Sequence, residues 1–107
     1  MRTSKFKSYR KFLRELREIC PTLVPVVTSR RTLKDCIAYT TLVRKDGLPH
    51  HFNICIERSL SWEAVWQVLV HEWAHARAWD EESDTVTDHG PAFGIAYSQI
   101  WGDVVEP

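Results

Sequence analysis

The sequence has few of the features that mark membrane, secreted or disulfide-linked proteins. No apolar run approaches the roughly 18 residues that a membrane-spanning helix requires, and the basic N-terminus has no apolar core like that of a secretory signal. The three cysteines, Cys20, Cys36 and Cys55, are widely spaced and form no CxxC pair, so neither a zinc ribbon nor a disulfide framework is indicated. We therefore expect a cytoplasmic protein, with no membrane partner, whose cysteines are buried free thiols.

Charge is balanced over the 107 residues but divided unequally along the chain. Residues 1–45 contain 12 Lys or Arg and 3 Asp or Glu, whereas residues 46–107 contain 2 Lys or Arg and 11 Asp or Glu. The basic half could attract nucleic acid or another polyanion. It could equally pair with the acidic half inside the fold or be solvated, which is the usual state of charged runs.

Periodicity predicts a single α+β domain over residues 1–107. Apolar residues recur every three or four positions in the first helix, which Pro21 ends, and β-branched and aromatic residues mark the strands. The predicted elements are a helix over 4–20, strands over 24–29, 36–44 and 51–57, a helix over 62–79, an acidic loop over 80–88 and a helix over 90–101.

The second and third predicted strands should form a hairpin. Asp46-Gly47 is a turn signal, and Pro49 lacks the N–H that strand pairing uses, so we expect a loop longer than two residues. In the strand 51–57, alternate residues beginning at Phe52 share one face. An exposed edge of this strand could take an extended peptide, although the sequence does not identify which strand lies at the sheet edge.

The helix predicted over 62–79 is apolar on nearly all sides, which is typical of a helix inside a protein. Ser61 is suited to be its N-cap, and Glu63 places a negative charge in the first turn. Within this helix, residues 71–75 read His-Glu-Trp-Ala-His. Two histidines and a glutamate in such surroundings cost desolvation free energy unless they have partners.

The HEWAH segment has the spacing of the metal-binding helix of a zinc hydrolase. Residues four apart lie on one face of a helix, so His71 and His75 can bind one Zn²⁺. Glu72, at the edge of that face, can reach a metal-bound water, whose pKa zinc lowers toward about 7. Glu72 would then take a proton during attack on a carbonyl and pass it to the leaving amine. The alternative is that the histidines only form hydrogen bonds in the core.

Zinc hydrolases usually have three protein ligands, and here the third would follow the helix. The candidates are Asp80, Glu81, Glu82, Asp84, Asp88 and His89. We favour His89, at the mouth of the last helix, because zinc prefers imidazole. The alternatives are that His89 caps the helix on the surface or that an acidic residue is the third ligand.

HEWAH at 71–75 followed by DHGPAF at 88–93 resembles the SprT-like metalloprotease family, which includes the Spartan proteases. The resemblance covers roughly residues 35–101. It implies a minimal zincin fold, zinc ligands His71, His75 and His89, and a general base at Glu72. It also implies a substrate strand paired to the sheet edge and, in some members, cleavage of proteins bound or crosslinked to DNA. The short length is compatible with a free-standing minimal protease of a virus or mobile element, acting in a host cell.

Several other residues have two interpretations each. Tyr97 could donate a hydrogen bond to a developing oxyanion or belong to the core. Asp88 could orient a ligand histidine or be a plain loop acid. His50 and His51 could border the cleft or lie on the surface.

The sequence thus predicts a zinc-dependent metallopeptidase that acts on a protein or peptide substrate, with DNA-associated proteins as one substrate class. One alternative is a binding module with a structural zinc, which contacts nucleic acid or a protein partner through the basic N-terminal helix. The other is a metal-free interaction protein with the same shape.

Overall fold

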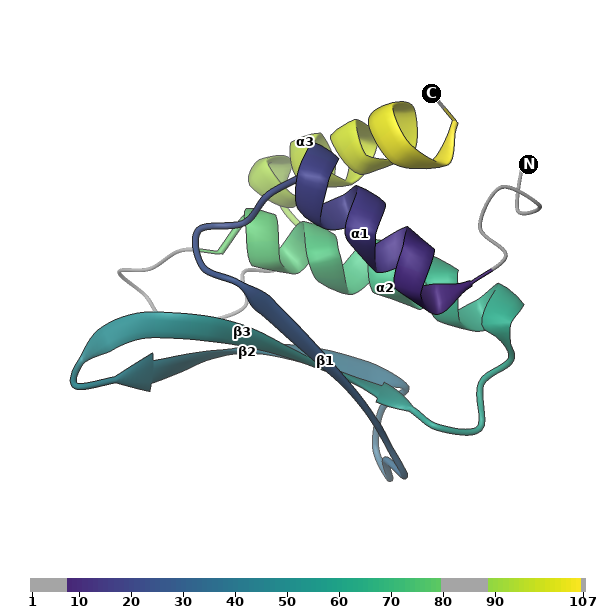
Figure 1. Cartoon of the computed structure of the whole chain (residues 1–107), viewed down its shortest axis with the longest axis horizontal. Coiled ribbons are helices and arrows are strands. Elements are labelled where there is room, and N and C mark those ends of the chain that lie inside the picture. Colours follow the sequence, from purple (N-terminus) through teal and green to yellow (C-terminus); the bar gives the residue numbers. More distant parts are fainter. Residues whose placement is uncertain (1–7, 80–88, 107) are drawn as a thin grey trace.

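Within the described part of the chain, three α-helices and a three-stranded mixed sheet form the fold, which confirms the predicted α+β class. The computed structural model describes residues 8–79 and 89–106. The elements are α1 (Tyr9–Ile19), β1 (Val26–Arg31), β2 (Ala38–Lys45), β3 (Leu48–Glu57), α2 (Trp62–Arg77), α3 (Pro91–Ile100) and a π-helical turn, η2 (Trp101–Val105). Figure 1 shows the helices gathered on one face of the sheet, with α2 nearest the strands.

β3 is the central strand of the sheet, whose order is β1-β3-β2. β1 pairs with β3 in parallel, with Val26 opposite Phe52, and β2 pairs with β3 antiparallel, with Ala38 opposite Ile56. Because β3 is paired on both sides, the expectation that the strand 51–57 offers an exposed edge is wrong. In the described chain, the two outer edges of the sheet belong to β1 and β2.

A two-residue turn joins β2 to β3, whereas the sequence led us to expect a longer loop. Asp46 and Gly47 have positive φ angles of 54° and 80°, as the tight turn of a hairpin requires. Opposite residues in an antiparallel pair alternate between hydrogen-bonded and non-bonded positions, and the pair next to the turn is bonded. Pro49 lies one position further, opposite Arg44. Its missing N–H therefore removes no hydrogen bond from the hairpin.

α2 begins where its capping signal predicts, because the Ser61 hydroxyl accepts a hydrogen bond from a backbone N–H in the first turn. Pro91 occupies the first turn of α3. α1 begins at Tyr9, later than the predicted start of the helix over 4–20, because Ser8 is extended and acts as the N-cap. Residues 4–7 lie outside the described residues.

The ends of the helices differ more from the prediction than their starts. α2 ends at Arg77, two residues before the predicted end, and the acidic loop 80–88 lies outside the described residues. The chain continues beyond α3 as η2, which buries Val104 and Val105 and which periodicity did not indicate. None of the described helices is both long and apolar enough to cross a membrane.

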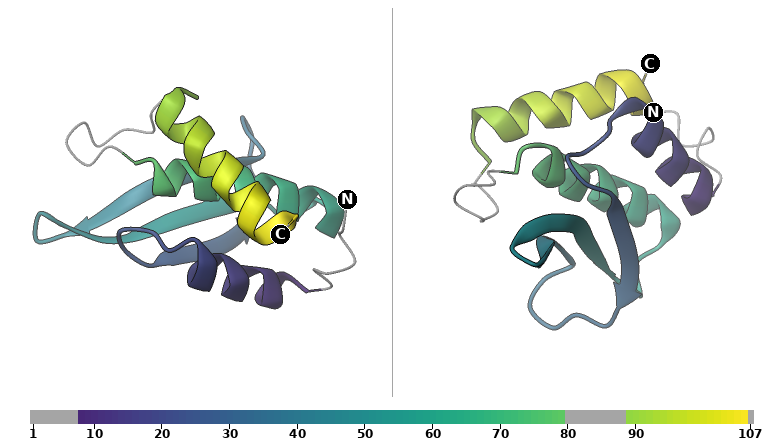
Figure 2. Two further views of the ribbon diagram at one scale, coloured as in Figure 1. Left: turned by 90° about the horizontal axis from the view of Figure 1, so that it is seen from above. Right: turned by 60° about the vertical axis from the view of Figure 1, so that its left-hand side comes forward.

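α2 occupies the centre of the hydrophobic core. The helix lies between the sheet and the other helices (Figure 2). Its fully buried apolar side chains belong to the hydrophobic core, and they are Val65, Trp66, Leu69, Val70, Trp73 and Ala74. The Trp66 ring lies edge-on to Phe12 of α1 and to Trp101 after α3. The Trp73 indole N–H donates to the Cys20 carbonyl oxygen at 2.8 Å, which ties α2 to the end of α1.

Two arginines of the basic half of the chain have structural roles. The Arg17 guanidinium donates to the Val26 carbonyl oxygen at 3.0 Å. Arg30 donates to three carbonyl oxygens between the end of β3 and α2. From the acidic half, Arg77 donates to the Pro21 carbonyl oxygen at 2.6 Å. These guanidinium groups satisfy backbone acceptors at strand ends and in connecting segments.

The expectation of buried thiols holds for two of the three cysteines. Cys20 and Cys55 are buried, and Cys36 is exposed. Cys36 lies in the segment before β2, which is an outer strand of the sheet in the described part of the chain.

Replacing Trp73 with phenylalanine should lower the free energy of unfolding by about 2 kcal/mol or more. The substitution removes volume from a buried site and leaves the Cys20 carbonyl oxygen without its donor. Urea unfolding followed by circular dichroism measures the change. Trp79→Phe is the matched control, because the Trp79 indole N–H has no hydrogen-bond partner among the described residues. Equal losses in the two variants would contradict a stabilising role for the Trp73 hydrogen bond.

Candidate metal centre

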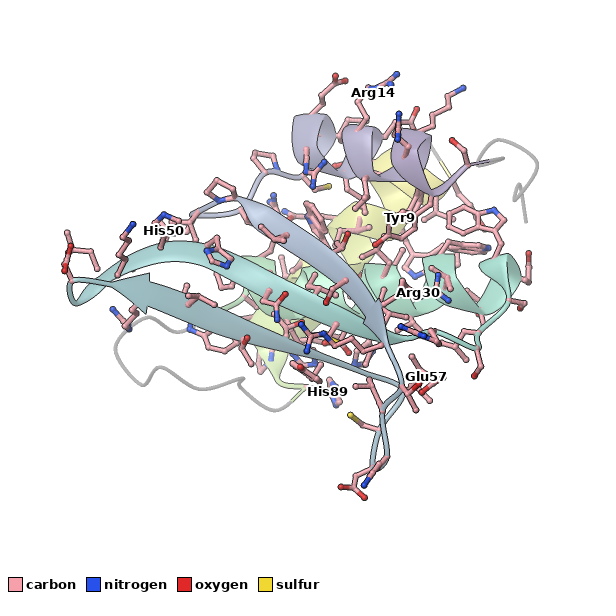
Figure 3. All side chains as sticks on the ribbon, turned by 60° about the horizontal axis from the view of Figure 1, so that its bottom comes forward. Tyr9, Arg14, Arg30, His50, Glu57 and His89 are labelled. Carbon is pink, nitrogen blue, oxygen red and sulfur yellow. The ribbon has the colours of Figure 1, made fainter. Side chains whose placement is uncertain are left out.

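Three imidazoles converge between α2 and the start of α3. His71 and His75 are one helical turn apart on α2, and His89 immediately precedes Gly90, the N-cap of α3 (Figure 3). One ligand atom from each histidine lies within 4.8 Å of the others, and the Nε2 atoms of His71 and His89 are 3.2 Å apart. The three histidines favoured as ligands from the sequence therefore lie close together and could bind a metal ion.

Phe93 packs against all three imidazoles. Its ring centroid lies 5.1 Å from that of His71, 4.6 Å from that of His75 and 4.7 Å from that of His89. Because Phe93 is buried on α3, this contact fixes the entry of α3 relative to α2. The sequence indicated Phe93 only as part of the DHGPAF motif. Its place four residues after His89, one turn into a helix, is the signal that could have identified this role.

The described surroundings favour neutral histidines. Burial, followed by the charges of His71 and His89, lowers the pKa of His75 to about 4. Burial also lowers the pKa of His71, although Glu72 opposes this effect. Both imidazoles are therefore neutral at pH 7, and a neutral imidazole can donate a lone pair to a metal.

One distance within the cluster matches that between two ligands of a tetrahedral zinc ion. Nitrogens bound to one zinc ion at about 2.0–2.1 Å in tetrahedral geometry lie roughly 3.3 Å apart, and the His71 and His89 Nε2 atoms are 3.2 Å apart. The same separation lets one of these imidazoles donate a hydrogen bond to the other when no metal is bound. The His75 Nδ1 atom is buried without a hydrogen-bond partner among the described residues. Such an atom is costly unless a ligand or water satisfies it.

Glu72 is buried beside the histidines without belonging to the cluster. It follows His71 on α2, and only 8% of its surface is exposed. Its Oε1 atom accepts a hydrogen bond of 2.6 Å from the hydroxyl of Thr40 on β2. The sequence predicted the place of Glu72 on the helix but not this partner, because a contact across 32 residues depends on how β2 lies against α2.

A cavity of about 440 Å³ opens beside His71 and Glu72. Three elements and the segment before β2 form its walls, and the lining residues are Cys36, Ile37, Ala38, Gln67, Val68, His71, Glu72 and Tyr97. The sequence left Tyr97 as either an oxyanion donor or a core residue. Tyr97 is half-buried, stacks on Phe93 with ring centroids 5.7 Å apart, and contributes to this wall.

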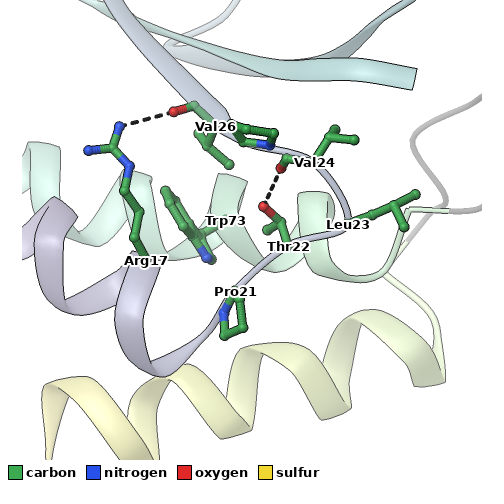
Figure 4. A pocket seen from close by; sticks show the side chains of 8 residues that line it. Arg17, Pro21, Thr22, Leu23, Val24, Val26 and Trp73 are labelled. Carbon is green, nitrogen blue, oxygen red and sulfur yellow. Dashed lines mark hydrogen bonds between the residues drawn. The ribbon is translucent and has the colours of Figure 1, made fainter. Parts of the chain in front are cut away.

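A second cavity, of about 310 Å³, lies between the end of α1 and the start of β1 (Figure 4). Arg17, Leu23 and Trp73 are among its lining residues, and none of the candidate site residues borders it. Arg17 already donates to the Val26 carbonyl oxygen there. This cavity therefore gives no support to the chemistry predicted from the sequence.

The remaining candidates lie elsewhere. His50 lies on β3 near the β2–β3 turn (Figure 3), and its Nδ1 atom is 2.8 Å from that of His51. Neither histidine lines the larger cavity. The acidic alternatives for the third ligand lie outside the described residues, and they are Asp80, Glu81, Glu82, Asp84 and Asp88. His89 is therefore the third ligand candidate that the described chain brings to His71 and His75.

Comparison with known proteins assigns no family to the chain. No protein-family model, no curated protein and no solved structure matches it. Conclusions about its activity therefore depend on the residues and geometry described above.

Proposed function

We propose that this chain is a zinc-dependent metallopeptidase with a minimal zincin fold of the SprT-like type. The observation that carries the proposal is the convergence of His71, His75 and His89 beside the buried Glu72. The site borders a cavity next to the open edge of β2. Three protein ligands with a nearby carboxylate outside the ligand set are what a zinc hydrolase requires.

Each residue has one role in the proposed hydrolysis. The three histidines would hold zinc, which when bound would lower the pKa of a water molecule to about 7. Glu72 would accept a proton from the water that attacks the peptide carbonyl, and would return it to the leaving nitrogen as the C–N bond breaks. Glu72 follows His71 on α2, is buried, and lines the same cavity as His71.

The open edge of β2 is suited to an extended peptide. The Glu57 N–H donates to the Ile37 carbonyl oxygen, so the odd-numbered residues in this part of β2 bond to β3. The alternation of an antiparallel pair then directs the backbone groups of Ala38, Thr40 and Leu42 away from β3. A substrate strand paired to these groups would run past the cavity that contains the candidate site.

Tyr97 is our candidate for the oxyanion donor. It lines the same cavity as His71 and Glu72 but comes from α3, across from the helix that carries them. Stacking on Phe93 fixes its ring relative to the imidazoles. A fixed phenol is able to donate a hydrogen bond to a carbonyl oxygen as negative charge develops.

A basic surface on α1 favours a second candidate, a binding module with a structural zinc. Arg10, Lys11 and Arg14 are exposed on this helix (Figure 3), and such side chains neutralise phosphates. The module would contact nucleic acid or a protein partner without cleaving it, whereas a peptidase with this surface could reach DNA-associated proteins. Affinity for a short DNA duplex that is unchanged between low and moderate salt would argue against phosphate contacts by α1.

Replacing His89 with alanine should weaken zinc binding by more than about 100-fold, because even the loss of an outer hydrogen-bond partner of a ligand costs about 10–100-fold. Metal analysis of purified protein and competition with a chromogenic chelator measure this change. His50→Ala is the control, since His50 is exposed and lies away from the cluster. Tight zinc binding by the His89 variant would indicate that the third ligand lies in the acidic segment 80–88. A wild type that contains no zinc after reconstitution would overturn the proposal.

The Glu72→Gln variant should keep about one zinc per chain and lose turnover by about 10²–10⁴-fold, the usual contribution of a general base. The amide preserves the size of the buried side chain but cannot accept the proton. Cleavage of a fluorescein-labelled unfolded protein by zinc-loaded enzyme measures the effect, with zinc content determined on the same sample. If the variant turns over substrate as fast as the wild type, Glu72 is not the general base.

A further inference from the structure

A single side chain from the sheet binds the carboxylate of Glu72. The Thr40 hydroxyl oxygen lies 2.6 Å from Glu72 Oε1 and 3.2 Å from the Glu72 carbonyl oxygen. Both residues are buried, with exposed fractions of 3% and 8%. Among the described residues, the only other buried polar or charged side chain is His75. The polar part of the core is therefore concentrated at this contact and the candidate metal centre.

The hydroxyl has one proton, so it donates fully to one of its two acceptors. The carboxylate is the stronger acceptor because it is charged, and 2.6 Å is the usual length of an O–H···O⁻ bond. We therefore take Glu72 Oε1 as the acceptor. The bond holds one carboxylate oxygen against β2 and leaves Oε2 available to the cavity that Glu72 lines.

Glu72 needs such a restraint if it is to act as a base. A glutamate side chain has several rotatable bonds, and Glu72 borders a cavity of about 440 Å³ in which a carboxylate could turn. A displacement of about 1 Å in a reacting group can reduce a rate by about 10²-fold. A hydrogen bond from a strand residue restricts the carboxylate more firmly than contacts within its own helix.

The position of Thr40 in the sheet adds a second consequence. Thr40 lies opposite Ile54 in the β2–β3 pair, and its side chain faces the helices. By the alternation of the pair, its backbone N–H and C=O point to the open edge of β2. Thr40 therefore donates to Glu72 through its side chain, and its backbone groups face the edge of β2 that is proposed to bind the substrate.

We propose that Thr40 is a positioning residue for Glu72, whose hydroxyl fixes the carboxylate beside the metal-binding histidines and in register with the edge of β2. This inference rests on the proposed function, because positioning matters only if Glu72 acts on a substrate. It assigns no direct contact with the reacting atoms to Thr40.

Two substitutions at Thr40 separate positioning from packing. Thr40→Val keeps the shape of the side chain and removes the hydroxyl, whereas Thr40→Ser keeps the hydroxyl and removes a methyl group from a buried site. In the full zinc-loaded chain, with fluorescein-labelled unfolded casein as the probe, we expect Thr40→Val to lower kcat by about 10–100-fold. KM should change by less than about twofold, and Thr40→Ser should restore most of the turnover. Thr41→Val, an exposed position on the same strand, is the matched control.

A readout without catalysis tests the contact itself. The unfolding equilibria of metal-free wild type, Thr40→Val, Glu72→Ala and the double variant form a double-mutant cycle. We expect a coupling of about tenfold in the unfolding equilibrium constant, because a hydrogen bond to a charged acceptor stabilises more than a neutral one. Zinc affinity should be the same in Thr40→Val and wild type, since Thr40 is not a member of the ligand cluster.

The possible failures are distinguishable. A wild type that binds zinc but cleaves nothing would overturn the proposed function, and the positioning role with it. An active wild type with an equally active Thr40→Val variant would overturn the positioning role alone. So would a Thr40→Ser variant that is slower than Thr40→Val, which would indicate packing, or independent effects of the two residues in the unfolding cycle.

Discussion

α2 lies between the sheet and the other helices, and most of its circumference is removed from water. The same helix carries His71, Glu72 and His75, so its burial brings polar groups into a core that offers few partners. Glu72 obtains a partner from β2, and the imidazoles obtain neighbours from α3. The arrangement of the strands and of α3 around α2 meets one requirement, which is to provide partners for the polar groups that α2 buries.

Much of the site follows from local sequence, because helical spacing is a local property. Residues 71–75 place two imidazoles one turn apart wherever the helix lies, and Ser61 fixes where the helix begins. The strand order and the Thr40 contact did not follow from the sequence. Both depend on segments far apart in the chain, and periodicity does not specify how such segments pair. The turn at Asp46-Gly47 was predicted, but Pro49 led us to expect a longer loop around it. The zincin interpretation and the chemistry built on it remain predictions until zinc and cleavage are measured.

The contact of Phe93 with three imidazoles links the core to the candidate metal centre. The Phe93 ring belongs to the hydrophobic core and contacts His71, His75 and His89. A centre built in this way is partly organised before any ion arrives, since the rings are held by packing. A metal that binds the folded form more strongly than the unfolded chain then adds to its stability by mass action.

The strand order also has a consequence for folding. β2 and β3 meet through a two-residue turn, and such hairpins form in about 1–10 μs. β1 is separated from β3 in the sequence by β2, and it pairs with β3 in parallel, with Val26 opposite Phe52. Non-local pairings of this kind form more slowly. The residues of the histidine cluster and of the neighbouring cavity all follow β1 in the chain. Substitutions confined to α1 and β1 should therefore act on folding without removing a side chain from the histidine cluster or from this cavity.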